Sequence, residues 1–118
     1  MLHLVADFGP SSTSPTFETY YYEPFNICAT GEWDSNTLTV QFNPAPDKGA
    51  PWTDLQQNGS TVTLTATDNA KALVFTGGVS LRLVSTTGAS TDLDIWVGGG
   101  GVVLKYPEGI TQADYVAL

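Results

Sequence analysis

Paired carboxylates are the residues of this sequence that come nearest to catalytic chemistry. Asp92 and Asp94 lie two residues apart, and Glu32 and Asp34 flank Trp33 in the same way. Residues two apart on a strand face the same side. Glycoside hydrolysis needs two carboxyl groups about 5 to 9.5 Å apart across a cleft. A small domain with short turns offers little cleft, so we expect no enzymatic activity from either pair.

The other reactive side chains are too few for a nucleophilic or zinc site. His3 is the only histidine and Cys28 the only cysteine. A serine or cysteine nucleophile needs a base held beside it, and His3 lies where order is least expected. One His and one Cys cannot supply a zinc site of nitrogen and sulfur ligands. We predict no catalytic residue and no cofactor; calcium at loop aspartates stays open, although no EF-hand spacing is present.

The elements that must position these side chains are strands. The sequence contains 16 Thr, 12 Gly and 7 Pro, with 42% hydrophobic and only 14% charged residues. Thr suits a pleated, half-buried surface, and Gly and Pro suit the turns between strands. Strand-like segments recur about every ten residues, as in an all-β sandwich or barrel. The predicted strands are residues 17–23, 25–33, 37–43, 60–67, 71–76, 79–86, 91–97 and 102–106.

Hydrophobic alternation assigns the two faces of these strands. The predicted core residues occupy every second position of their segments: Leu38, Val40, Phe42, Val62, Leu64, Ala66, Leu81, Leu83, Leu93, Ile95 and Val97. In the first two segments, residues 37–43 and 60–67, the opposite face is mostly Thr. In the segment of Leu81 and Leu83, Arg82 faces outward. One buried and one wet face is typical of antiparallel sheets. We therefore predict an all-β fold, an antiparallel β-sandwich of Ig-like or jelly-roll-like type.

The chain length and the positions of its Pro- and Gly-rich segments predict one domain with an arm at either end. A chain of 118 residues buries about two-thirds of its surface in one core. Residues 1–16 end in small polar residues and prolines and predict an N-terminal arm. Residues 17–97 form the sandwich, and residues 98–118 a glycine hinge, a last strand and a C-terminal arm. A Gly-Gly pair, Gly77 and Gly78, predicts a hairpin.

The charge balance limits the classes of partner. Twelve acidic and four basic residues give a net charge of −8. This charge repels phosphate backbones and anionic lipid heads. No apolar run approaches the length of a membrane span, and the first residues lack the features of a secretory signal. We expect neither nucleic acid nor a membrane as partner.

Aromatic side chains supply the candidate partner-binding residues. If the apolar residues of the segment STDLDIWV face the core, Asp92, Asp94 and Trp96 face outward. An outward Trp between carboxylates predicts a contact surface, unless one of the chain's own arms covers it. Tyr20 and Tyr22 share one side of their strand. Exposed aromatic rings could bind a partner protein or stack on sugars.

Trp52 is the remaining candidate, at the end of the Pro-rich loop FNPAPDKGAP. It is either a plug over one end of the core or a binding platform at a loop mouth. Asp47, Lys48 and Asp54 lie near it in the sequence, without a base or a nucleophile. The sequence favours the plug.

Five short motifs follow one another between residues 31 and 97: Gly31-Glu32-Trp33, Thr37 to Phe42, Pro44 to Gly49, Trp52 to Leu55, and Ser80 to Val84. In this order they resemble small β-sandwich virion proteins of tailed bacteriophages, of the decoration, cement or head-fibre type. The resemblance implies a non-enzymatic virion protein that decorates or cements the capsid surface. Its partners would be the major capsid protein or other virion subunits, with a homo-oligomer, a trimer in particular, as its own state. The alternative from the exposed aromatics is a carbohydrate-binding module or a tail or fibre adaptor.

Overall fold

The computed structural model describes residues 2–19, 25–66, 70–73, 79–99 and 103–104. Within these ranges every paired strand runs antiparallel to its neighbour. The single helical element there is one 3-10 turn, η1 (Pro46–Lys48). In the same residues, no helix has the length and apolar character needed to cross a membrane. The predicted all-β, antiparallel fold class is confirmed.

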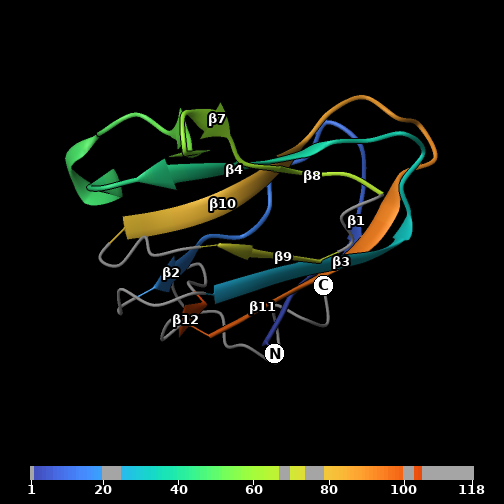
Figure 1. The fold of residues 1–118 in the computed structure, drawn as a ribbon, viewed down its shortest axis with the longest axis horizontal. Coiled ribbons are helices and arrows are strands. Elements are labelled where there is room, and N and C mark those ends of the chain that lie inside the picture. Colours follow the sequence, from blue (N-terminus) through green and yellow to red (C-terminus); the bar gives the residue numbers. More distant parts are fainter. Residues whose placement is uncertain (1, 20–24, 67–69, 74–78, 100–102, 105–118) are drawn as a thin grey trace.

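One layer of the molecule is sheet A, with the strand order β1-β11-β3-β9 in the described residues (Figure 1). Its strands are β1 (Leu2–Phe8), β3 (Phe25–Glu32), β9 (Ala70–Leu73) and β11 (Asp92–Gly99). The central strands β3 and β11 pair along their whole length, from Asp92 opposite Glu32 to Gly99 opposite Phe25. Because β11 has a neighbour on either side, its side chains are held on a rigid support.

The other layer is sheet B, with the order β12-β2-β10-β4-β5 and β8 also paired with β4. Its strands are β2 (Phe17–Thr19), β4 (Leu38–Asn43), β5 (Thr53–Asp54), β8 (Thr63–Leu64), β10 (Val79–Ser85) and β12 (Val103–Leu104). A small hairpin of β6 (Gln56–Gln57) and β7 (Ser60–Thr61) lies between β5 and β8 in the chain. Asn58 and Gly59 form its turn with φ of 54° and 79°, the positive values that a two-residue hairpin favours.

The two sheets share one core. Its fully buried side chains come from both layers: Phe25, Ile27, Ala29, Leu93, Ile95 and Val97 from sheet A, and Phe17, Leu38, Val40, Leu64, Leu81 and Leu83 from sheet B. The predicted alternation is thus confirmed for the long strands, and Phe42 is half-buried against the same core. Ala66 is the exception, since it lies beyond the end of β8 and is exposed.

Two connections differ from the prediction. The segment 60–67 is divided between β7 and β8, which pair with different strands. The prediction of a hairpin at Gly77-Gly78 is wrong, because a hairpin would pair β9 with β10. Instead, β9 pairs with β3 in sheet A and β10 pairs with β2 and β4 in sheet B. A Gly-Gly pair permits a tight turn, but it does not decide which sheet the next strand joins.

The expected N-terminal arm is also wrong for residues 2–14. Leu4 and Phe8 of β1 are 1% and 3% exposed and belong to the core. Residues 11–14 then run beside β10, where the amide of Ser14 donates to Leu83 O and the amide of Ser85 donates to Ser12 O. The pairing of β1 with β11 shifts register twice, so the strand lacks the alternation by which a sequence pattern identifies it.

Two residues of the predicted glycine hinge belong to a strand instead. Gly98 and Gly99 are the last residues of β11 and pair with Asn26 and Phe25 of β3. The last predicted strand is present as β12, which pairs with β2. The remainder of the predicted hinge and C-terminal arm, residues 100–102 and 105–118, lies outside the described residues.

Three loops meet at one end of the two layers, which we call the closed end: residues 9–14, 33–37 and 86–91 (Figure 1). Asn36, 1% exposed, joins two of them with four side-chain hydrogen bonds. Its Nδ2 donates to Thr86 O and Thr91 Oγ1, and its Oδ1 accepts from the amide and the hydroxyl of Thr86. Ser85 links the third loop, since its hydroxyl donates to Gly9 O at 2.7 Å.

Candidate functional site

The outer face of sheet A carries three of the predicted contact residues. Asp92, Asp94 and Trp96 occupy alternate positions of β11, and the side chains between them are fully buried in the core. Asp92 is exposed, and Asp94 and Trp96 are half-buried. The predicted outward orientation of all three is confirmed. We call this surface, together with His3 and Asp7 of β1, the Trp96 face.

His3 lies directly across from Trp96 in the pairing of β1 with β11. The two rings stack with their centroids 4.9 Å apart and their planes 23° apart. The chain's own N-terminal segment therefore covers one side of Trp96, which was one of the two alternatives that the sequence left open. The indole is nevertheless only half-buried, so part of it remains available to a partner.

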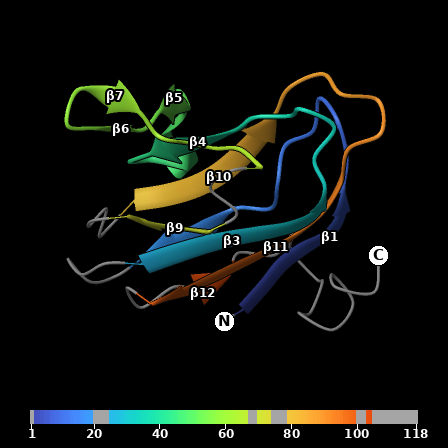
Figure 2. The same cartoon turned by 45° about the vertical axis from the view of Figure 1, so that its right-hand side comes forward.

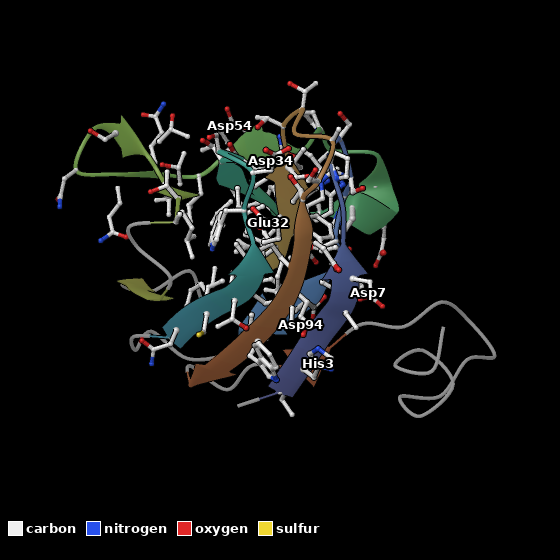
Figure 3. All side chains as sticks on the ribbon, turned by 90° about the vertical axis from the view of Figure 1, so that its right-hand side faces the viewer. His3, Asp7, Glu32, Asp34, Asp54 and Asp94 are labelled. Atoms are coloured by element: carbon white, nitrogen blue, oxygen red, sulfur yellow. The ribbon has the colours of Figure 1, made fainter. Side chains whose placement is uncertain are left out.

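The same histidine approaches a carboxylate. Nε2 of His3 lies 3.7 Å from Oδ1 of Asp94, which is too long for a hydrogen bond. Nε2 has no hydrogen-bond partner in the described part of the chain. The side chain of Asp94 is 47% exposed. Figure 3 shows His3, Asp94 and Asp7 on this one face, with Glu32 and Asp34 farther toward the loops.

Like charges gather around Asp92. The pKa of Asp92 is raised above its ordinary value. The largest cause is partial desolvation, followed by the negative charge of Asp7, a hydrogen bond with the Asp7 side chain and the charge of Asp94. Glu32 stands opposite Asp92 in the pairing of β3 with β11, so another acidic residue lies at this end of the same face. Among the described residues, no group of acidic, His or Cys side chains is arranged to hold a metal ion.

The other acidic pair from the sequence, Glu32 and Asp34, has a local structural role. Oε1 of Glu32 accepts a hydrogen bond from the amide of Asp34 at 3.0 Å. Oδ2 of Asp34 accepts from the amide of Ser90 at 2.9 Å. Asp34 and Ser35 have φ of 47° and 59°, and these bonds hold the turn at the closed end.

A second polar cluster lies on the outer face of sheet B. Arg82, Gln41 and Asp54 form a row across β10, β4 and β5. Nε of Arg82 donates to Oε1 of Gln41 at 2.9 Å, and Nε2 of Gln41 donates to Oδ1 of Asp54 at 3.0 Å. The guanidinium carbon of Arg82 lies 4.3 Å from the centroid of the Trp52 ring. We call these four residues the Arg82 face.

The predicted plug at Trp52 is wrong. Trp52 is half-buried and outside the core cluster, because the pairing of β5 with β4 sets it beside Arg82. Trp33, 7% exposed, fills the core end instead. The signal for Trp33 was present, since it continues the inward series of every second residue in β3. Glycine is required at position 31 because the backbone of β11 lies too close for a side chain: a Cβ on Gly31 would lie 2.4 Å from Asp92 O.

Sequence reasoning found some members of both faces and missed others. Tyr20 and Tyr22 lie outside the described residues and stay predictions. His3 and Asp7 were missed as members of the Trp96 face because their strand was assigned to an arm. Arg82 was predicted to face outward, but its stacking on Trp52 depends on a pairing between β4 and β5 for which the short sequence of β5 gives no signal.

Comparison of the chain with protein-family models, with curated proteins and with solved structures finds no match. The candidate site therefore depends on geometry. Its two faces combine an aromatic ring with fixed charges on a rigid sheet. Such surfaces are suited to binding, because Trp and Arg are the residue types most enriched among interface hot spots.

Proposed function

We propose that the protein is a structural component of a tailed-bacteriophage virion. It would decorate or cement the capsid surface through contacts with the major capsid protein, other virion subunits or neighbouring copies of itself, as a homo-oligomer. The observation that carries the proposal is Trp96, a half-buried indole held outward between carboxylates on the central strand β11. The class of partner comes from the motif resemblance of residues 31–97.

The arrangement of the sheets supports a β-sandwich of the jelly-roll-like type. Consecutive main strands lie in alternate sheets, with β1, β3, β9 and β11 in sheet A and β2, β4, β10 and β12 in sheet B. Ig-like domains instead join several consecutive strands within one sheet. Jelly rolls, which are common in viral capsid proteins, are double-sheet Greek keys.

Rigidity supports a binding role for Trp96. The stack with His3 and the two neighbours of β11 hold the indole before any partner arrives. A side chain that is already ordered loses little entropy on binding. An anchor of this kind suits a component that must bind many identical subunits.

The test is cosedimentation with capsid shells of the phage that encodes the protein, prepared without it. Wild-type protein should bind the shells saturably, and Trp96→Ala should weaken binding about tenfold or more. Gln56→Ala, an exposed change in the small hairpin, is the control and should bind as wild type does. Thermal melts monitored by circular dichroism verify that each variant is folded. Failure of the wild type to bind, or full binding by Trp96→Ala, would overturn the proposal.

A carbohydrate-binding module is the second candidate, and the Arg82 face favours it. Trp52 lies there beside the hydrogen-bonding groups of Arg82, Gln41 and Asp54, a combination that sugars bind. Titration with a broad panel of sugars, followed by tryptophan fluorescence, tests it. A saturable change lost in Trp52→Ala would support this function, and no change across the panel would remove it. Binding to tails or fibres but not shells would favour an adaptor.

A further inference from the structure

Arg82 is a partly dehydrated cation without a counter-ion in the described residues. Its contacts there are the hydrogen bond from Nε to Gln41 and the stack on Trp52, and it forms no ion pair with any of these residues. Burial lowers the pKa of Arg82 from its ordinary value, which is the sign of a charge held away from water. A guanidinium has five N–H donors in a rigid fork, so its terminal nitrogens keep donors for a carboxylate.

The Trp96 face has the opposite imbalance of charge: several carboxylates and few cations. Asp7, Asp92 and Asp94 crowd together, and His3 is the one basic side chain of the described residues in contact with this cluster. Each of these carboxylates would gain from an external cation. The face also offers a half-buried indole beside the charges, as the Arg82 face does.

These complementary faces cannot meet within one molecule. The Trp96 face is the outer side of sheet A and the Arg82 face is the outer side of sheet B, with the core between them (Figure 2). Arg82 is also the only arginine in a chain of net charge −8. A contact that satisfies both faces therefore needs two copies of the chain.

We infer that the Arg82 face of one copy binds the Trp96 face of a second copy. The fork of Arg82 receives a carboxylate of Asp94 or Asp92, as guanidinium groups do in two-pronged pairs. Trp52 and Trp96 exclude water around the pair. The contact joins two different surfaces, so it repeats from copy to copy and forms a ring or an open chain. The inference specifies the contact between copies that the proposed function includes. Its test does not depend on a virion role, because it needs no other virion protein and uses the purified chain alone.

Charge reversal tests the contact in sedimentation-velocity or light-scattering measurements on purified protein at low salt and rising concentration. Arg82→Glu should raise the dissociation constant for self-association about tenfold or more. Lys48→Glu makes the same change of net charge at an exposed position of η1 and should leave association unchanged. Asp94→Arg should weaken association in the same way, with Asp47→Arg as its control.

Mixing the two variants gives the decisive result. Arg82→Glu and Asp94→Arg should each associate poorly alone but associate with each other, because the carboxylate introduced by the first variant can pair with the guanidinium introduced by the second. A contact between two identical faces would not be restored in this way. Wild-type protein that stays monomeric at every concentration, Arg82→Glu protein that associates as wild type does, or a mixture that remains unassociated would each overturn the inference. Circular dichroism melts verify that both variants are folded.

Discussion

The closed end and the outer faces of the sheets treat polar side chains in opposite ways. Asn36 at the closed end is 1% exposed and makes four side-chain hydrogen bonds within the chain. Arg82 on the outer face of sheet B is half-buried and makes one, with no ion pair to a described residue. A buried polar group without partners is costly, so the closed end must be completed by the chain itself. The outer faces retain unused hydrogen-bonding and charged groups, and it is there that we propose partners bind.

Trp33 and Trp52 differ in the same way as Asn36 and Arg82. Trp33 closes the core end and Trp52 lies on the outer face of sheet B, although the two flank the same strand β4 in the chain. Their different burial follows from strand pairing. Mutations at the two sites can therefore measure how far stability and binding are separated in this fold.

The largest effect is expected at Trp33. Trp33→Ala should lower the free energy of unfolding by about 3 to 5 kcal/mol, because it leaves a cavity at the core end. Chemical denaturation followed by circular dichroism measures the loss. Trp33→Phe is the matched control and should cost much less, since Nε1 of Trp33 has no hydrogen-bond partner in the described residues. A normally stable Trp33→Ala protein would contradict the assignment of Trp33 as the plug.

Asn36 comes second. Asn36→Ala should cost about 2 to 3 kcal/mol of unfolding free energy, because four hydrogen bonds of this buried side chain are lost at once. One of them is made to the hydroxyl of Thr91, which is also buried. The same denaturation experiment measures it. The control is Thr87→Ala, an exposed change in the neighbouring loop that carries Thr86 and Thr91. If both variants lose the same small amount, the network does not hold the closed end.

Sequence pattern was sufficient for the strands that alternate strictly. In β4, β10 and β11 the alternating apolar residues predicted to face the core are buried, apart from the half-buried Phe42, since alternation reports directly which face a side chain occupies. It failed for β1, whose two register shifts remove the alternation. It also failed for the Gly77-Gly78 connection, because the choice of sheet is made by long-range packing rather than by the turn.

The candidate site was predictable only where it depends on a single strand. The outward placement of Trp96 and its two aspartates follows from β11 alone, and it is correct. The stack of His3 on Trp96 and the row of Arg82, Gln41 and Asp54 each join strands far apart in the chain. No local pattern contains such pairings, so the neighbours of both candidate tryptophans required the structure.

A smaller effect is expected at Trp52. Trp52→Ala should cost about 1 to 2 kcal/mol of unfolding free energy, because it removes the stack on Arg82 and some buried area but opens no cavity in the core. Denaturation under the conditions used for Trp33→Ala makes the two values comparable. A loss at Trp52 equal to that at Trp33 would show that the outer face contributes to stability as the core end does.

The smallest effect concerns Asp92 and has a sign that depends on pH. Its pKa in the folded chain is raised above the ordinary value of 3.8, so the fold disfavours the charged form. Below 3.8 the carboxyl is protonated in both the folded and unfolded states and carries no penalty. As the pH rises from there through the folded pKa, the carboxylate forms beside Asp7 and Asp94 and stability is lost.

Asp92→Asn should therefore be more stable than wild type at about pH 7 and equal to it at about pH 3, because the amide can still donate to Asp7 without a charge. Urea midpoints at the two pH values, at protein concentrations low enough to prevent association, measure the difference. Asp47→Asn in η1 controls for the loss of one negative charge. If Asp92→Asn gains the same stability at both pH values, the charge of Asp92 is not repelled by its neighbours. The Trp96 face would then lack the repulsion between carboxylates that a cationic partner would relieve.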